Sequence, residues 1–130
     1  MRLTNFYSAQ KHTPGQSDTL KISVIVPTLN EASIVEDSLR AISGLNPHEI
    51  IVVDGRSTDS TFLVARRMAN LVITSKPGRA YQMNAGAKKA TGDLLLFMHV
   101  DNKLSFESFK KMKKTMLLTE SNGGAFTLQI

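Results

Sequence analysis

The 130-residue sequence contains no cysteine, which excludes disulfide bonds and zinc sites built from thiolates. It has no tryptophan and only two tyrosines, which disfavours an aromatic platform that stacks on single-stranded nucleic acid. No uninterrupted apolar run approaches the roughly 18 residues of a membrane-spanning helix. Residues 1–18 lack the apolar centre of a signal peptide, so a cytoplasmic location is the default expectation.

The formal net charge is +5, and many of the positive charges lie in one segment near the end of the sequence. They are Lys103, Lys110, Lys111, Lys113 and Lys114. A solvated helix face is the simplest interpretation of this cluster, and a surface for phosphates, nucleic acid or an anionic membrane is the alternative. The three histidines, at positions 12, 48 and 99, do not have the spacing of a zinc site.

From residue 21 onward, short apolar runs alternate with segments of helical periodicity. The predicted strands are Ile22–Val26, Glu49–Val53, Leu71–Thr74, Asp93–Met98 and Ala125–Ile130. The predicted helices are Ala32–Ser43, Asp59–Ala69, Arg79–Ala90 and Ser105–Leu118. Asp59 is expected to be an N-cap, and the helix side chains expected to face inward include Phe62, Leu63, Met68, Phe106, Phe109, Met112 and Met116. Residues 1–20 are polar and aperiodic and are expected to form a flexible leader, which leaves 21–130 as one domain.

This alternation predicts an α/β fold, namely an open, Rossmann-like, mostly parallel sheet with helices on both faces. Ligands of such sheets bind beyond the carboxyl ends of the strands. Polar segments follow four of the predicted strands, at 27–31, 54–59, 76–79 and 99–102. Each segment alone is explained by a turn or a helix cap, but together they predict one binding site on one rim of the sheet.

The residue types at this rim suit a diphosphate ligand that is bridged by a metal ion. Asp101, at a strand end, is a carboxylate of the kind that holds Mg²⁺ or Mn²⁺. Arg79 follows Gly78 at a helix start, where it would meet a phosphate, and Asp54 would accept hydrogen bonds from a base or ribose. The G-x-G-x-x-G, P-loop and G-x-S-x-G motifs are absent, which disfavours three rival classes of α/β protein.

Four segments together resemble the family 2 glycosyltransferases of GT-A fold, in particular a bacterial subgroup with H-x-D in place of the D-x-D motif. They are ISVIVPTLNE (22–31), VVDGRSTDST (52–61), KPGRAYQMNAGAKKATGDLLLFMHVD (76–101) and GGAF (123–126). The resemblance spans about residues 21–130 and implies a nucleotide-diphospho-sugar donor, a divalent metal (Mg²⁺ or Mn²⁺) and transfer of the sugar, usually with inversion. The implied donor-binding residues are Pro27, Thr28, Asn30, Glu31, Asp54, Arg79, Gln82 and Asn84. The implied metal ligand is Asp101, with His99 as a second candidate.

The sequence departs from the common family pattern at three places. Asp54-Gly55-Arg56-Ser57 stands where D-D-G-S is usual, so the second carboxylate is missing. His99 occupies the first position of D-x-D. Family members carry the acceptor site and the general base on later segments, so the base is expected beyond Ile130 and the chain is expected to be a truncated, donor-binding half. The acceptor is unknown; a lipid-linked acceptor and association with a membrane surface are expectations from the resemblance, whereas nucleic acid is not expected as a partner.

Two other functions remain as alternatives. A nucleotidyltransferase would carry a glycine-rich G-x-G-T-R-like loop after its first strand, and 27–31 does not have one. A non-catalytic domain would instead bind a partner, through apolar surface on the predicted helix at 105–118 and on the last predicted strand.

Overall fold

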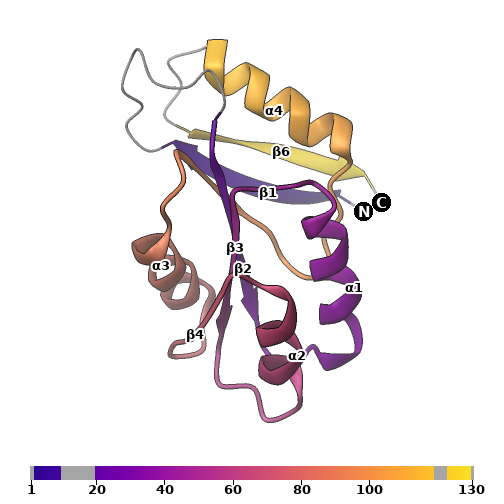
Figure 1. Ribbon diagram of the computed structural model, residues 1–130, viewed down its shortest axis with the longest axis vertical. Coiled ribbons are helices and arrows are strands. Elements are labelled where there is room, and N and C mark those ends of the chain that lie inside the picture. Colours follow the sequence, from indigo (N-terminus) through magenta and orange to yellow (C-terminus); the bar gives the residue numbers. More distant parts are fainter. Residues whose placement is uncertain (1, 10–19, 119–122, 130) are drawn as a thin grey trace.

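The computed structural model describes residues 2–9, 20–118 and 123–129, which form one six-stranded sheet with helices on both faces (Figure 1). In chain order the elements are β1 (Arg2–Ala9), β2 (Ile22–Thr28), α1 (Ala32–Ser43), β3 (Glu49–Asp54), α2 (Thr61–Met68), β4 (Leu71–Thr74), α3 (Arg79–Lys89), β5 (Leu94–Phe97), α4 (Phe106–Leu118) and β6 (Gly123–Gln129). The α/β class that the sequence predicted is confirmed.

The four strands β4, β3, β2 and β5 are adjacent in that order and run parallel. The chain moves outward from β2 to β3 and β4, and then crosses back to the other side of β2 to form β5. The direction of winding therefore reverses between β2 and β5. In an open α/β sheet, such a reversal leaves a crevice at the carboxyl ends of the two strands.

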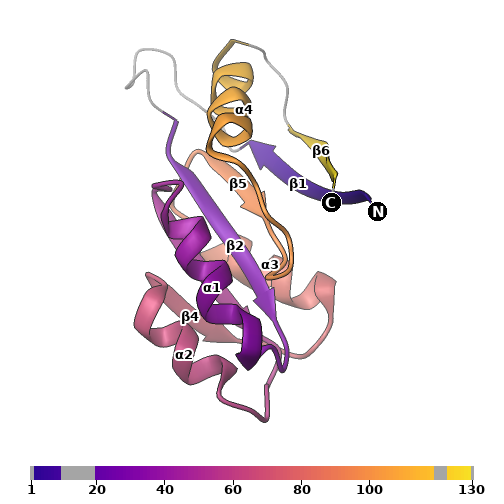
Figure 2. The ribbon, with the colours of Figure 1, turned by 90° about the vertical axis from the view of Figure 1, so that its right-hand side faces the viewer.

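Both faces of the parallel sheet are buried, which explains why its strands read as nearly continuous apolar runs. Val24 and Val26 of β2 belong to the core under α1, α2 and α4, whereas Ile25 belongs to the core under α3. This is the alternation that a strand imposes on successive side chains. Figure 1 shows α3 on one side of the sheet and α1 and α2 on the other, and Figure 2 shows α1 in front of β2.

Helix α3 approaches the sheet very closely because its inner face is built from small residues. A Cβ atom added at Gly86 would lie 2.5 Å from Ile25 Cγ2 and 2.9 Å from Val53 Cγ2. Those distances leave no room for any side chain at this position. The glycine therefore fixes how deep α3 sits, and with it the position of the helix start at the rim.

In two helices, the residues that are buried differ from those that were predicted. In α4, Phe109 and Met112 are buried as predicted, but Phe106 in the first turn is 57% exposed. In α2, the buried residues are Thr61 and Ala65, and Leu63 is 60% exposed. Helix α2 has only eight residues and packs with a narrow, small-residue face, so its larger apolar side chains lie at the border of the core or outside it.

The predicted flexible leader is wrong for residues 2–9. These residues form β1, which pairs antiparallel with β5, with Tyr7 opposite Leu96. The segment carries strand-favouring residues such as Thr4, Phe6 and Tyr7, but its partner lies about ninety positions away in the chain, outside the reach of local patterning. The predicted last strand exists as β6, which pairs antiparallel with β1; Ile130 lies outside the described residues.

Candidate functional site

The parallel strands end on a common rim, at Thr28, Asp54, Thr74 and Phe97. The loops that leave β2 and β5 lie on either side of the point where the winding reverses, where a ligand of an open α/β sheet is expected. Hydrogen bonds and charge interactions link the loops to one another, as the following residues show. The four polar segments that the sequence singled out are thus brought together.

Asp54 is a buried support of the rim, with 1% of its surface exposed. Its Oδ1 accepts hydrogen bonds from Thr28 Oγ1 (2.9 Å) and Ser57 Oγ (2.6 Å), and its Oδ2 accepts one from Ser57 N–H (2.8 Å). A carboxylate that is buried and engaged in this way holds the loop after β3 against the end of β2. The geometry favours this supporting role over the contact with a base or ribose that the sequence suggested, and it gives Thr28, 1% exposed, a supporting role as well.

Asn30 ties the loop after β2 to the loop after β3. Its backbone adopts a left-handed conformation (φ 51°), which asparagine tolerates better than most residues. Its Oδ1 accepts hydrogen bonds from Thr58 N–H (2.7 Å) and Thr58 Oγ1 (3.2 Å), and its own N–H donates to Ser57 Oγ (2.8 Å). Ser57 and Thr58 were missed as site residues, although their place in an S-T-D turn next to a strand end was a usable signal.

Asp59 joins the starts of two helices rather than capping one. Its Oδ2 accepts a hydrogen bond from Ala32 N–H in α1 (3.2 Å), and its Oδ1 accepts from the backbone and side chain of Thr61 in α2. The N-cap position of α2 itself is Ser60, one residue later than predicted. The hydrogen bonds from Thr61 lower the pKa of Asp59, since they favour its charged form.

Gln82 stabilises the rim through hydrogen bonds from its buried amide to the backbone. Gln82 is 5% exposed, and its Nε2 donates to Thr28 O (3.0 Å) and Val53 O (2.9 Å), near the carboxyl ends of β2 and β3. Its Oε1 accepts from Gly78 N–H (3.1 Å). The Gln82 amide is therefore occupied by the backbone of two strand ends and of the turn before α3, whereas Asn84, two residues on, is exposed on α3.

Arg79, at the start of α3, meets His99, in the loop after β5. Gly78 has a φ of 137°, a conformation that side chains disfavour, and this turn starts α3 with Arg79 exposed at its first position. The Arg79 Nη2 atom contacts His99 Nε2. Burial lowers the pKa of His99, the neighbouring Arg79 charge lowers it further, and Asp101 acts in the opposite direction.

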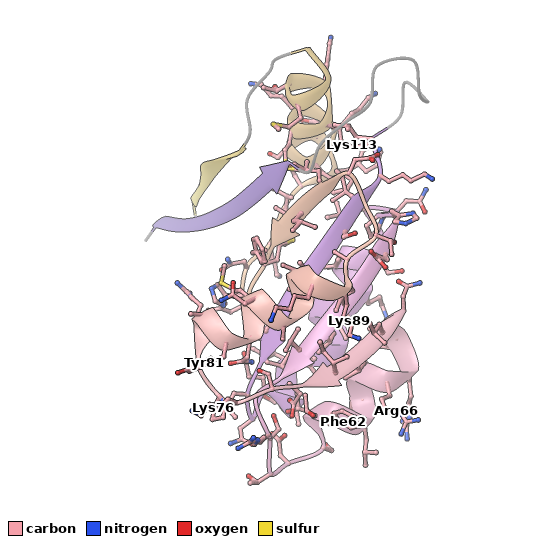
Figure 3. The ribbon with its side chains drawn as sticks, turned by 90° about the vertical axis from the view of Figure 1, so that its left-hand side faces the viewer. Phe62, Arg66, Lys76, Tyr81, Lys89 and Lys113 are labelled. Carbon is pink, nitrogen blue, oxygen red and sulfur yellow. The ribbon has the colours of Figure 1, made fainter. Side chains whose placement is uncertain are left out.

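Lys76 and Tyr81 flank the turn at Gly78, and neither was predicted as a site residue. The Lys76 ammonium lies 5.1 Å from the centre of the Tyr81 ring, a cation–π contact that spans the turn (Figure 3). The sequence signal was an aromatic residue five positions after the lysine of the K-P-G-R segment. The pair adds a second positive charge to the side of the rim that carries Arg79.

Negative charge gathers around Glu31, in the loop after β2, and Asp101, in the loop after β5. Burial raises the pKa of Glu31, and the hydrogen bond from Leu29 N–H (3.1 Å) opposes that rise. The negative charge of Asp101 repels Glu31 and raises its pKa further, and more distant aspartates at the rim add to the effect. Glu31 is half-buried and Asp101 is exposed, so the Asp101 carboxylate is open to a ligand.

Within the described residues, no group of three or more histidine, cysteine, aspartate or glutamate side chains is arranged to hold a metal ion. A cation at this rim would therefore take most of its ligands from water and from a bound anion. Mg²⁺ binds in this way in many proteins, through one or two carboxylates and substrate phosphates. Pro27, the remaining predicted residue, is buried opposite Val53 within the sheet.

Known proteins are similar to this chain in sequence. The sequence is 34% identical over 92 residues to the dolichol-phosphate mannosyltransferase of Pyrococcus furiosus, a match that covers 63% of this chain and 26% of that protein. It is 36% identical over 91 residues to a PGL/p-HBAD biosynthesis glycosyltransferase of Mycobacterium tuberculosis, covering 63% of this chain and 36% of that protein. The chain therefore spans about a quarter to a third of the length of these relatives.

Solved structures of known proteins are similar to this chain in fold. Glucosyl-3-phosphoglycerate synthase from Mycobacterium tuberculosis, in complex with Mn²⁺, UDP and glucosyl-3-phosphoglycerate, superposes with a TM-score of 0.67 at 24% identity, over 87% of this chain and 48% of that one. Mannosyl-3-phosphoglycerate synthase from Rubrobacter xylanophilus superposes with a TM-score of 0.60 at 26% identity, over 66% of this chain and 32% of that one. The fold is that of the GT-A glycosyltransferases.

The sequence pattern of the family described as Glycosyl transferase family 2 matches residues 23–123, which include every element from β2 to α4. Because this match covers most of the chain, the chain belongs to glycosyltransferase family 2.

Proposed function

We propose that this chain forms the donor-binding half of a glycosyltransferase, which binds a nucleotide-diphospho-sugar across the crevice between β2 and β5. The observation that supports this most is that opposite charges gather on one rim. Arg79 contacts His99, which precedes Asp101 in the loop after β5, and Asp101 is close enough to Glu31 to repel its carboxylate. A diphosphate and its counter-cation need this pairing of a cationic and an anionic surface.

A divalent metal fits the acidic side. Several structural relatives are complexes with UDP and either Mn²⁺ or Mg²⁺. In this chain, the exposed Asp101 would hold the ion. Burial is the main cause of the raised pKa of Glu31, and a cation would relieve the repulsion from Asp101 that adds to it. When bound, the metal supplies charge neutralisation to the diphosphate that leaves when the sugar is transferred.

The residues of the chain itself have distinct tasks in this proposal. Arg79 binds the diphosphate, and the accessible part of the loop after β2, from Leu29 to Glu31, lines the nucleoside pocket. Asp54 and Gln82 keep the two loops of that pocket in place through the hydrogen bonds described above. An inverting displacement also needs a general base that deprotonates the acceptor, and none of the described residues is assigned to that task.

A partner-binding, non-catalytic role is less well supported. It required apolar surface on α4, but Phe109, Met112 and Met116 are buried in the core, so that face is already covered. A nucleotidyltransferase is disfavoured by the segment from Leu29 to Glu31, which is not glycine-rich.

The basic side of α4 supports a second proposal, that it rests on an anionic membrane surface. Lys110, Lys111 and Lys114 are exposed there, next to exposed Phe106. Among the described residues, no helix has the length and apolarity to cross a bilayer. Contact would therefore be made at the surface, through charge and one aromatic side chain.

Calorimetric titration with UDP, GDP, UDP-glucose and GDP-mannose, with and without Mn²⁺, tests the donor-site proposal. At least one nucleotide is expected to bind, and more tightly with Mn²⁺. Asp101→Ala should abolish the gain from Mn²⁺, because it removes the carboxylate that holds the ion.

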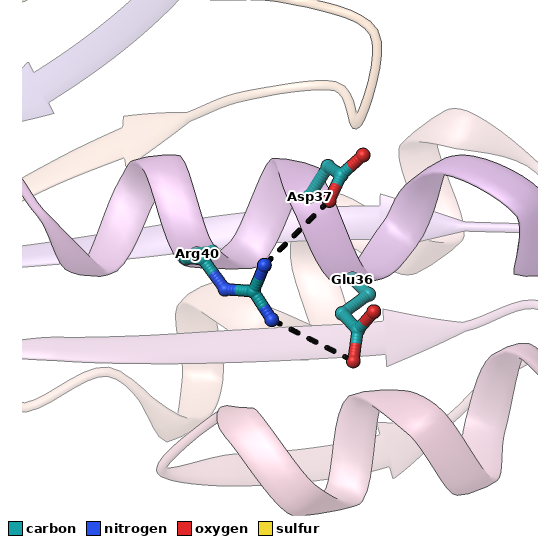
Figure 4. A network of polar contacts seen from close by, with 3 residues as sticks. All are labelled: Glu36, Asp37 and Arg40. Carbon is teal, nitrogen blue, oxygen red and sulfur yellow. Dashed lines mark ion pairs between the residues drawn. The ribbon is translucent and has the colours of Figure 1, made fainter.

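The control is Asp37→Ala. Asp37 lies on the exposed face of α1, where Arg40 contacts both Asp37 (3.9 Å) and Glu36 (3.8 Å), as Figure 4 shows. This variant should keep the full gain from Mn²⁺. A folded wild-type protein that binds none of the four ligands would refute the proposal, and an unchanged Mn²⁺ gain in Asp101→Ala would refute the role of Asp101.

A further inference from the structure

The contact between Arg79 and His99 assigns the imidazole the role of hydrogen-bond acceptor. A guanidinium group carries only hydrogen-bond donors. In its contact with Arg79 Nη2, His99 Nε2 is therefore the acceptor. An imidazole that accepts at Nε2 has its ring proton on Nδ1.

This geometry leaves His99 no free lone pair for a metal ion. A neutral imidazole has one unprotonated nitrogen, and it coordinates metals through that atom. In His99 the atom is already engaged by Arg79, and the other nitrogen is protonated. Contact with Arg79 and coordination of a metal are thus mutually exclusive for this side chain.

The same contact orients Arg79 without cancelling its charge. Among the side chains that the structure describes, both ion pairs belong to Arg40, so Arg79 is paired with no carboxylate there. An aspartate at position 99, the common family form, would be a charged acceptor and would neutralise the guanidinium. A neutral imidazole holds the guanidinium in place and leaves its full charge for an anion.

The backbone on which Arg79 stands is also fixed. Gly78 N–H donates to Gln82 Oε1 (3.1 Å), and Gln82 N–H donates to Gly78 O (2.9 Å). Gln82 in turn is bonded to the ends of β2 and β3. Both the base and the tip of the Arg79 side chain are therefore held, which reduces the conformational entropy lost when it binds a ligand.

We propose that His99 is a positioning residue: it holds the Arg79 guanidinium toward the diphosphate, and the metal-binding role at this strand end falls to Asp101 alone. This rests on the proposed donor site. His99 acts through Arg79, so its removal should weaken nucleotide binding without changing the requirement for metal.

The experiment measures two quantities by calorimetry for UDP and GDP: the affinity at saturating Mn²⁺, and the Mn²⁺ concentration that gives half of the maximal gain. His99→Phe should bind nucleotide roughly tenfold more weakly, as expected for the loss of one hydrogen bond to a charged group. Its half-maximal Mn²⁺ concentration should stay at the wild-type value. Asp101→Ala should show the reverse pattern, with the metal response lost.

A double-mutant cycle identifies the partner of His99. His99→Phe should have little further effect in an Arg79→Ala background, and its full effect in an Asp101→Ala background. His99→Gln should restore most of the affinity, because its amide oxygen is an acceptor at a similar reach. Thermal unfolding midpoints close to wild type would show that the variants are folded, and the rescue by glutamine excludes a general loss of structure.

The two proposals fail in different ways. If the folded wild-type protein binds neither UDP nor GDP, the donor site itself is refuted, and this inference with it. If the wild-type protein binds but His99→Phe raises the Mn²⁺ requirement, or couples to Asp101 rather than Arg79, the positioning role is refuted and the donor site stands.

Discussion

At the scale of single residues, Gln82 shows how much of the rim depends on one buried amide. Replacement by methionine keeps the length of the side chain but removes the donor to Thr28 O and Val53 O and the acceptor of Gly78 N–H. We expect Gln82→Met to lower the free energy of unfolding by about 2–4 kcal/mol, because buried backbone groups lose their partners. Denaturation in guanidinium chloride measures this difference.

Lys89→Ala is the matched control, since Lys89 is exposed at the end of the same helix (Figure 3). It should change the unfolding free energy by no more than about 0.5 kcal/mol. Equal stability of Gln82→Met and wild type would show that the amide does not brace the rim.

Glu49, at the start of β3 and away from the rim, is expected to make a pH-dependent contribution to the stability of the fold. Burial alone would raise the pKa of Glu49, but hydrogen bonds from Ser23 Oγ and from Thr91, through its N–H and its hydroxyl, outweigh burial and lower it. A carboxyl with a lowered folded-state pKa stabilises the protein above its unfolded-state pKa, and this contribution is lost as the pH falls through the folded-state pKa.

The wild-type protein should therefore be more stable than Glu49→Gln at neutral pH, and the difference should shrink as the pH falls through the usual glutamate range. Thermal unfolding of both proteins at a series of pH values measures it. A difference that stays constant, or grows, toward acid pH would contradict this interpretation.

The residues of the site were predictable in position but not in orientation. The sequence places Asp54, Gln82 and Arg79 at strand ends and a helix start, and the structure brings them to one rim. Whether each side chain faces the ligand or the loop backbone depends on its neighbours in space. Asp54 is turned inward by Thr28 and Ser57, residues that are polar but carry no motif of their own.

At the scale of elements, the parallel strands and their helices follow from local patterns, because each βαβ unit is continuous in sequence and buries both faces of its strands. β1 could not be predicted from local patterns, since it pairs antiparallel with β5, which is far away in the chain. The exposure of Phe106 and Leu63 could not be predicted from local patterns either. Helical periodicity gives a face, but the packing of a short helix or a first turn decides which apolar residues lie outside it.

Helix α4 is expected to bind anionic vesicles through its exposed lysines. Its buried residues Phe109 and Met112 anchor it, which leaves Lys110 and Lys114 exposed. Each lysine near an anionic bilayer contributes about 1 kcal/mol, so reversing both charges should weaken vesicle binding by more than tenfold. Sedimentation with vesicles of phosphatidylcholine and phosphatidylglycerol measures this, and binding should also fall with added salt.

The control for α4 is Lys88→Glu with Lys89→Glu, which reverses two exposed charges on α3, on the opposite face of the sheet. It has the same net charge as the α4 variant but should bind vesicles like the wild-type protein. If both double variants lose binding equally, net charge alone is responsible, and if the wild-type protein does not sediment, the membrane proposal is wrong.

At the scale of the whole molecule, β1 and β6 extend the parallel sheet beyond β5, at the end where α4 lies and away from β4 and α2 (Figures 1 and 2). The charged rim is built entirely from loops of the parallel part. β1 pairs with β5 over Phe6–Ala9 and with β6 over Arg2–Ser8, so it connects β6 to the rest of the sheet.

Removal of residues 1–9 should therefore lower stability without removing the donor site. It leaves the outer edge of β5 unpaired and separates β6 from the sheet, and an unpaired edge invites association with other chains. We expect a lower unfolding midpoint and concentration-dependent self-association, measured by calorimetry and sedimentation velocity, while UDP or GDP binding persists in dilute solution. A truncated protein that stays monomeric with an unchanged midpoint would show that the parallel strands are stable by themselves, and that β1 does not protect the edge of β5.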